Sequence, residues 1–119
     1  MGNPRRLRRL VVGTVTWRWS VHHRRGDDSG EVLTLHREAT GGRLRIVFRP
    51  GPGRLMSDAL WQTGSVGCRD SGAVLNLHEP NVVRRLLDAA AARGALTGLA
   101  GRAEREVDGW PLFAELVDR

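Results

Sequence analysis

The stretch Arg43-Leu44-Arg45-Ile46-Val47-Phe48-Arg49 decides the fold class. Its apolar side chains recur at every second residue, and arginine occupies most of the positions between them. Because successive side chains of a strand point to opposite faces, this alternation predicts a half-buried strand. One face would pack on a core through Leu44, Ile46 and Phe48, and the other would present arginine to solvent.

Two further segments with the same period lie on the N-terminal side of this strand. Residues 10–22 alternate around two tryptophans, and residues 31–37 alternate around two leucines. Glycine and polar residues cluster at 24–30 and 39–42, and such clusters are typical of turns. Three strands joined by short loops predict an antiparallel meander.

A helix is predicted on the C-terminal side, beyond the proline- and glycine-rich residues 50–53 that interrupt the sheet. Pro80 suits the first helical position, Glu79 suits the positive end of the helix dipole, and Gly94 suits the left-handed residue that ends a helix. Apolar side chains recur between these ends at helical spacing: Val82, Val83, Leu86, Leu87, Ala90 and Ala91. We therefore expect a helix over 80–93.

The remaining segments carry weaker signals. Residues 55–62 fit either a short helix or a strand, and residues 64–72 are predicted as a loop. Residues 74–77 and 112–117 are predicted as short strands, and residues 103–107 as one helical turn. The sequence therefore predicts an α+β fold, in which an antiparallel β-meander packs against one main α-helix and a short C-terminal strand closes the structure.

A single core is expected, because a chain of 119 residues has the length of one domain. Residues 1–9 would form a basic N-terminal arm, and residues 10–119 a single α+β domain. The predicted core comprises Val15, Trp17, Trp19, Leu33, Leu35, Leu44, Ile46, Phe48, Leu75, Leu77, Val83, Leu86, Leu87, Ala90 and Phe113.

The charge of the chain is distributed unevenly. The formal net charge is +6, yet residues 1–26 hold seven arginines and no acid, while the other twelve arginines and all thirteen acids follow. This distribution excludes a uniformly basic body of the histone kind. Lysine is absent, which is typical of a GC-rich bacterial genome, so codon bias is an alternative explanation of the arginine excess.

The sequence shows no pattern of a metal or cofactor site. His22 and His23 are adjacent and would point to opposite faces of a strand, and His36 and His78 lie on separate segments. A structural zinc site would show paired ligands two to four residues apart. Residues 51–54 lack the Gly-Lys-Ser/Thr ending of a phosphate-binding loop. We therefore expect no metal and no cofactor.

An enzymatic function is not expected either. Cys68 precedes Arg69, and a neighbouring cation lowers the pKa of a thiol. A thiol nucleophile also needs a base within hydrogen-bond reach, and among the histidines only His78 comes into question. We therefore expect no catalytic residues. A single cysteine and the absence of a membrane-length apolar run favour a cytoplasmic protein that does not engage a membrane.

The arginines are the strongest candidate binding residues. On the predicted strands, Arg18 and the arginines of 43–49 project away from the apolar side chains, and the basic arm would extend this polar stripe. The candidate residues are Arg5, Arg6, Arg8, Arg9, Arg18, Arg43, Arg45 and Arg49. Such a stripe fits phosphate contacts, but the tryptophans lie on the apolar register, which disfavours base stacking.

Two functional hypotheses remain open. The first is a small non-enzymatic binding module that engages a protein partner or assembly through the basic arm and a sheet edge, with a further contribution from Trp61, Trp110 or one edge of the helix. The alternative is a nucleic-acid-binding accessory protein that uses the N-terminal arginines and the arginine face of the sheet. The sequence does not indicate the oligomeric state.

Part of the chain resembles a group of small uncharacterised bacterial proteins. The resemblance rests on residues 77–83, on the helix ends Pro80 and Gly94, and on residues 109–113, with residues 17–19 as the tryptophan-containing meander. In that group a β-meander precedes a helix that opens with Ile-Thr-Pro and closes with Ala-x-x-x-Gly-Trp before a short final strand. Here Glu79 stands in place of the threonine, and Ala95 follows Gly94 in place of the tryptophan. The resemblance covers about half of the chain and implies a small α+β domain without an assigned activity.

Overall fold

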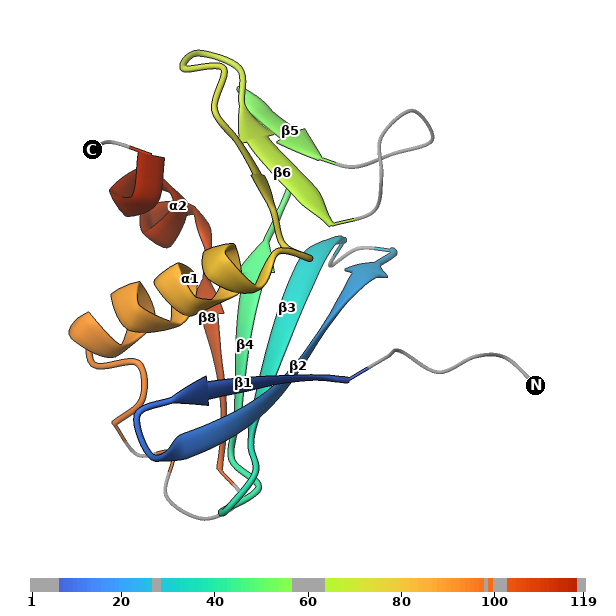
Figure 1. Ribbon diagram of the computed structural model, residues 1–119. Coiled ribbons are helices and arrows are strands. Elements are labelled where there is room, and N and C mark those ends of the chain that lie inside the picture. The colour runs from blue at the N-terminus through green and yellow to red at the C-terminus, as the bar shows by residue number, and fades with distance from the viewer. Residues whose placement is uncertain (1–6, 27–28, 57–63, 98, 100–102, 118–119) are drawn as a thin grey trace.

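The computed structural model describes residues 7–26, 29–56, 64–97, 99 and 103–117 (Figure 1). Its elements are, in chain order, β1 (Arg8–Val12), β2 (Val15–Arg24), β3 (Gly30–Arg37), β4 (Arg43–Phe48), β5 (Arg54–Met56), β6 (Ser65–Cys68), β7 (Val74–Asn76), α1 (Pro80–Ala92), β8 (Glu104–Asp108) and α2 (Trp110–Val117). Within the described residues, five strands form a main sheet in the order β1-β2-β3-β4-β8, and β5-β6-β7 form a small sheet. The predicted α+β fold is confirmed.

The main sheet begins as the predicted antiparallel meander and ends with a crossover. Strands β1 to β4 pair antiparallel with their neighbours in sequence. Strand β8 then pairs parallel with β4, so the chain between them has to travel back along the sheet. That connection contains the small sheet and α1, and Figure 1 shows both beside the main sheet.

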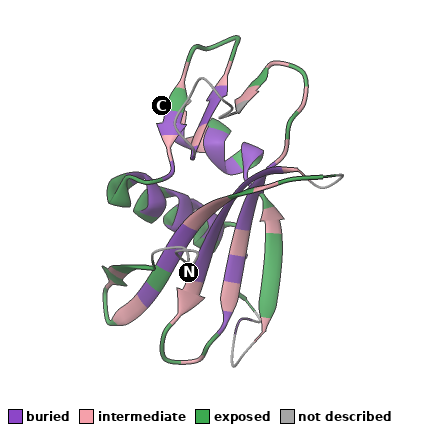
Figure 2. Ribbon diagram, turned by 90° about the vertical axis from the view of Figure 1, so that its right-hand side faces the viewer, coloured by how far each residue is buried: buried purple, intermediate pink, exposed green. Residues whose placement is uncertain are grey.

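The core lies between the helices and one face of the main sheet (Figure 2). Alternate residues of the central strands face the helices, so that Trp19, Leu35 and Leu44 are direct cross-strand neighbours and are all buried. Helix α2 packs on the same face, because the ring of Trp110 meets Phe48 edge to face at 5.4 Å. The predicted core residues belong to this cluster, with Val15 only partly buried at its border.

A buried carboxylate joins the main sheet to the segment that begins the small sheet. Glu31 of β3 is completely buried. Its Oε1 accepts a hydrogen bond from the Gly64 amide at 3.0 Å, and its Oε2 pairs with Nδ1 of His23 on the neighbouring strand. A buried charge is tolerated only where its oxygens find partners. Glu31, His23 and Gly64 therefore form one polar junction inside an otherwise apolar layer.

Helix α1 confirms the prediction closely. It spans Pro80–Ala92, with proline in its first turn and Gly94 following in the left-handed conformation at φ 79°. Its buried residues face the sheet and α2: Val82, Val83, Leu86, Leu87, Ala89 and Ala90. Most of the wide apolar arc of this helix is therefore core, whereas Ala91 of the predicted arc is exposed. A partner at one edge of the helix stays a prediction.

The N-terminal segment differs from the prediction. The alternation predicts one strand over residues 10–22, but a two-residue turn at Gly13 and Thr14 divides the segment into β1 and β2, which pair from Val12↔Val15 onward. Gly13 adopts a positive φ of 63°, which glycine reaches without a steric penalty. The first strand begins at Arg8, so Arg8 and Arg9 belong to the sheet and not to the predicted arm.

The C-terminal segment also differs. The predicted strand over 112–117 is helix α2, and the predicted helical turn over 103–107 is strand β8. Asp108 Oδ1 accepts a hydrogen bond from the Trp110 amide at 3.1 Å, which caps the start of α2. The predicted loop over 64–72 contains strand β6. Part of the ambiguous segment 55–62 belongs to β5, and residues 57–63 lie outside the described residues.

Candidate interaction surface

We call the face of the main sheet that points away from the helices the outer face. Its central row runs across the sheet through Arg9, Arg18, His36, Arg43 and Glu104, which are successive cross-strand neighbours. Directly opposite residues of paired strands point to the same side of the sheet. Both described helices lie on the other side (Figure 2), so no described helix covers the outer face.

A second row of the outer face runs parallel to the first. It contains Ser20, Thr34, Arg45 and Glu106. Ser20 and Thr34 are buried although no described helix covers them, because the longer side chains of the neighbouring strands surround them. The next row contains Val32 and Val47, which are completely buried. The outer face therefore has a floor of small hydroxyls and valines, with long cationic side chains around it.

The arginines of the outer face are paired with glutamates. Short contacts join Arg45 to Glu104 at 2.8 Å, Arg49 to Glu106 at 2.7 Å and Arg18 to Glu38 at 2.7 Å, and contacts of 3.4 Å join Arg43 to Glu104 and Arg24 to Glu106. The side chains of these pairs remain between 24% and 49% exposed. Ion pairs at this exposure contribute about 0–1 kcal/mol each. These pairs reduce the net positive charge of the outer face, but they are too weak to hold the arginine side chains in one conformation.

The pairing also affects the titration of Glu104. A hydrogen bond from Arg45 and the charge of its guanidinium lower the pKa of Glu104, to which Arg43 adds. A carboxyl whose pKa is lowered in the folded state stabilises the fold at pH values above its unfolded pKa, and this contribution disappears as pH falls through the folded pKa. Glu104 is therefore an anion at neutral pH, and the outer face carries both charge signs.

A hollow of about 490 Å³ lies in the outer face. Its lining residues are Leu7, Ser20, His22, Arg24, Thr34, His36, Arg43 and Arg45. None of these described lining residues is acidic, since the glutamates stand beside the hollow on β8. We call this the outer-face hollow. It offers guanidinium, imidazole and hydroxyl groups together, which suits an anionic ligand.

The predicted binding residues are brought together in part. Arg9, Arg18, Arg43 and Arg45 share the outer face through the strand register, and Arg49 reaches it through its contact with Glu106.

Arg8 does not join them. It is opposite Trp19 in the register, and its guanidinium lies 4.8 Å from the centre of the Trp19 ring, on the helix side of the sheet. The placement of Arg8 in the arginine stripe is therefore wrong. Arg5 and Arg6 lie outside the described residues.

The sequence reasoning missed the acids of the outer face. In β8, Glu104 and Glu106 face outward, while Arg105 faces the helix side and donates to the carbonyls of Gly94 and Thr97. The alternation of charge in residues 104–108 was the available signal, but a segment with almost no apolar residue does not reveal which strand it pairs with.

Trp110 has a structural role that excludes it as a binding residue of the free surface. The sequence places it in an irregular segment and suggests a contribution to an interface, but it belongs to α2 and is only 8% exposed. Its indole Nε1 donates a hydrogen bond to the carbonyl of Arg49 at 2.8 Å. The other candidate, Trp61, lies outside the described residues.

The histidines and Cys68 do not gather into a site. His22 points to the outer face and His23 to the helix side, as their adjacency on a strand predicts. His78 packs against Gly64 at the beginning of β6, whereas Cys68 ends that strand. Among the described residues, no three His, Cys, Asp or Glu side chains lie close enough to hold a metal ion.

Cys68 should nevertheless react readily. Hydrogen bonds from the Ser71 amide and the Ser71 hydroxyl, and one from the Asp70 amide, lower the pKa of the Cys68 thiol. We expect alkylation by iodoacetamide to show a pH midpoint below the value of about 8.5 for a free cysteine. Ser71→Ala should raise this midpoint, whereas Ser65→Ala, in the same small sheet, should not. An unchanged midpoint in Ser71→Ala would mean that the hydroxyl does not stabilise the thiolate.

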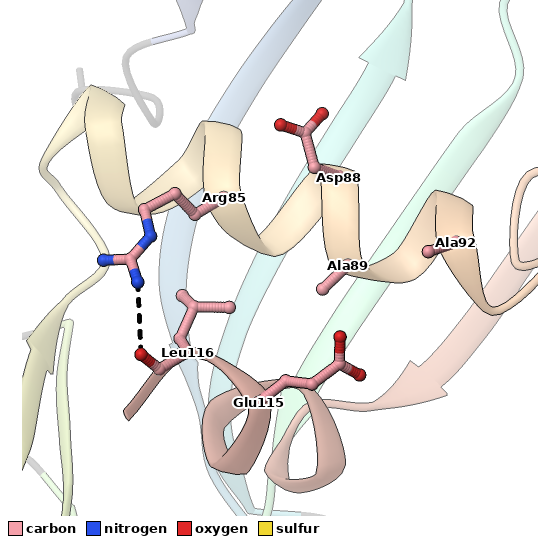
Figure 3. Close-up of a pocket in the computed structure, with 6 residues that line it drawn as sticks. All are labelled: Arg85, Asp88, Ala89, Ala92, Glu115 and Leu116. Carbon is pink, nitrogen blue, oxygen red and sulfur yellow. Dashed lines mark hydrogen bonds between the residues drawn. The ribbon is translucent and has the colours of Figure 1, made fainter. Parts of the chain in front are cut away.

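A second hollow, of about 330 Å³, lies between α1 and α2 (Figure 3). Arg85 crosses it and donates to the carbonyl of Leu116 at 3.1 Å. At its border, Glu115 pairs with Arg93 at 2.7 Å. The polar groups of this hollow thus bind one another and tie the two helices together, which gives it a structural role.

Crossing a bilayer requires a longer and more apolar helix than either of those in the described part of the chain. No protein-family model, curated protein or solved structure matches this sequence.

Proposed function

We propose that this protein is a small non-enzymatic binding module that engages an acidic protein partner or assembly through its main sheet, in the cytoplasm. The observation that carries the proposal is the outer face, where arginines, histidines and hydroxyls surround a hollow of about 490 Å³. A single cysteine in the chain is the support for a cytoplasmic location.

The ion pairs favour a protein partner over a nucleic acid. Arg43 and Arg45 share Glu104, and Arg49 is held by Glu106. A polyanion would meet these carboxylates together with the arginines and be repelled by them. A protein surface carries both charge signs and can satisfy both, and electrostatic complementarity of this kind selects partners. The half-exposed pairs are weak, so acidic side chains of a protein partner can bind the arginines while its basic side chains bind the glutamates.

Nucleic-acid binding is the second candidate function. The specific observation in its favour is the absence of acids among the described residues that line the outer-face hollow. A phosphate group placed between Arg43, Arg45 and His36 would receive charge-assisted hydrogen bonds. This function would show a steep decrease of affinity with salt, since phosphate contacts release counterions.

Charge removal on the outer face should abolish partner capture. We expect the double variant Arg43→Gln, Arg45→Gln to lose about tenfold or more in affinity for the captured partner, because two charge-assisted contacts are removed. The matched control is Arg84→Gln, Arg93→Gln, which removes two exposed, ion-paired arginines from the helix side. Capture from lysate of the source organism, quantified by mass spectrometry with and without nuclease, compares the two variants.

The outcomes separate the candidate functions. The proposed function is supported if the control captures a partner protein, the outer-face variant does not, and nuclease does not release that protein. The purified partner must then show the same difference in affinity between the two variants. Release by nuclease, together with retention of the purified wild-type protein on duplex DNA at about 150 mM salt, supports the second candidate. If the two variants capture the same proteins equally well, the proposal that the outer face binds the partner is wrong.

A further inference from the structure

The edge of the main sheet contains a gap beside β2. The ladder between β1 and β2 ends at the pair Arg8↔Trp19, whereas the ladder between β2 and β3 continues to Arg24↔Gly30. Within the described residues, Ser20–Arg24 therefore have a neighbouring strand on the β3 side alone. A strand segment that has no strand neighbour on one side is a template for an additional strand.

The register identifies the backbone groups that face the gap. The Glu38 amide donates to the carbonyl of Thr16 at 2.9 Å, so Thr16 directs its polar groups toward the β3 side. In an antiparallel strand this direction alternates from residue to residue. Val21 and His23 are therefore the residues that direct their N–H and C=O groups toward the gap.

Two hollows lie on the two sides of this gap. On the helix side, Arg8, Trp19, Ser20, Val21 and His78 line a hollow of about 400 Å³, which we call the edge hollow. On the other side, the outer-face hollow is lined by residues that include Ser20, His22 and Arg24. The side chains of a docked strand alternate between the two faces of the sheet. The residue opposite Val21 would enter the edge hollow, and the residues opposite its neighbours would enter the outer-face hollow.

The edge hollow is lined by Trp19 and by the cation of Arg8. Trp19 is 1% exposed, and its indole Nε1 has no hydrogen-bond partner among the described residues. A buried donor without an acceptor is costly. The guanidinium of Arg8 stacks over the same ring and donates to the carbonyl of His78 at 2.6 Å. None of the described residues that line either hollow is acidic. Both hollows are complementary to carboxylate side chains.

We propose that an extended acidic segment of a partner protein adds to β2 as a strand beside Ser20–Arg24. Its backbone would bond to Val21 and His23, and its alternate side chains would place carboxylates in the two hollows. The residues that precede β1 in this chain carry Arg5 and Arg6 and no acid, so they add positive charge that suits an acidic partner. This inference rests on the proposed function and specifies how the acidic partner is recognised.

The test uses a synthetic valine-rich peptide with three consecutive glutamates at its centre, so that carboxylates face both sides of the docked strand. It is added at millimolar concentration, and amide NMR of the intact protein reports its binding. We expect the His23 and Val21 amide signals and the Trp19 indole signal to shift on titration. The variant Val21→Pro removes the N–H that faces the gap, and an edge strand tolerates proline at such a position. It should bind the peptide tenfold or more weakly.

The matched control is Val11→Pro. Val11 is opposite Thr16 on β1, so its N–H faces away from β2 at the same sheet edge. This variant should bind the peptide as the wild type does, and thermal unfolding of both variants checks that they are folded. If Val21→Pro unfolds, the wild-type protein is titrated with a second peptide of the same composition whose central residues are N-methylated. This peptide cannot donate backbone hydrogen bonds to β2, so it should not shift the Val21, His23 and Trp19 signals.

The remaining outcomes overturn the inference in distinguishable ways. If the peptide shifts the signals of Arg43 and Arg45 while Val21 and His23 are unchanged, docking at the gap is wrong and the proposed function stands. If no signal shifts at millimolar peptide, docking at the gap and binding of acidic segments by the outer face are both wrong. If the Val21 and His23 signals change with protein concentration before peptide is added, a second copy of the chain occupies the gap and the acidic partner does not.

Discussion

Replacement of Glu31 by alanine is expected to lower the free energy of unfolding by about 3 kcal/mol, because it breaks a buried polar junction from its centre. The carboxylate is completely buried and has one partner on each oxygen, the Gly64 amide and the His23 ring. Alanine leaves the buried Gly64 amide without its acceptor and opens space behind β3, whereas the His23 ring, which is 37% exposed, can bond to water instead. Urea unfolding gives the change directly, and for a chain of this size the melting temperature should fall by about 12 °C.

Two further variants make this prediction specific. Glu38→Ala removes a carboxylate that is 46% exposed and pairs with Arg18 at the surface, so its effect should stay within about 1 kcal/mol. His23→Ala removes one partner of Glu31 and leaves the Gly64 hydrogen bond, so it should have an intermediate effect that is not additive with Glu31→Ala. If Glu31→Ala is as stable as Glu38→Ala, the junction does not stabilise the fold.

Replacement of Gly30 by alanine is expected to have a still larger effect, about 4 kcal/mol, because strain and a steric clash act together. Gly30 has a φ of 150°, which is strained for any residue with a side chain. In addition, a Cβ at this position would clash with the carbonyl oxygen of Phe48. That oxygen belongs to the backbone of β4 beside the pair Glu31↔Phe48, so no side-chain rotation relieves the clash. The central strands have to separate locally.

Gly72→Ala is the matched control for Gly30→Ala. Gly72 also has a positive φ, of 73°, but no heavy atom lies within 4 Å of the position that an alanine methyl group would take there. Its replacement should therefore cost about 1 kcal/mol through backbone strain alone. The free energies of unfolding of the two variants, from calorimetry or denaturant unfolding, separate the cost of backbone strain from the cost of the steric clash. Equal losses of stability would show that β3 and β4 do not approach as closely as described.

The meander and the main helix could be predicted because their signals are local. The alternation in 43–49 and the proline and glycine at the ends of α1 depend on residues close together in sequence. The turn at Gly13 and Thr14 was hidden because β-branched residues continue the alternation on both sides of it. Helix α2 was missed because periodicity alone does not separate a short apolar strand from a short buried helix.

The arginines of the candidate surface could be predicted from the sequence, but their glutamate partners could not. The outward direction of Arg18, Arg43 and Arg45 follows from strand alternation, and the register confirms that they share a face. Their neutralisation by Glu104 and Glu106 depends on the parallel pairing of β4 with β8. Nothing local indicates that pairing, since residues 104–108 form a strand through tertiary contacts that override their weak intrinsic preference.

The parallel pairing of β4 with β8 also sets an order of events for the newly made chain. Strands β1 to β4 follow one another through short turns, so their loops close early and at little entropic cost. Strand β8 can join only after the small sheet and α1 have been synthesised and folded back. Until then Arg43 and Arg45 lack Glu104 as a counter-ion, and β4 has an unpaired edge. The incomplete chain therefore carries more uncompensated positive charge and one more unpaired strand edge than the native protein, and completion of the fold reduces both.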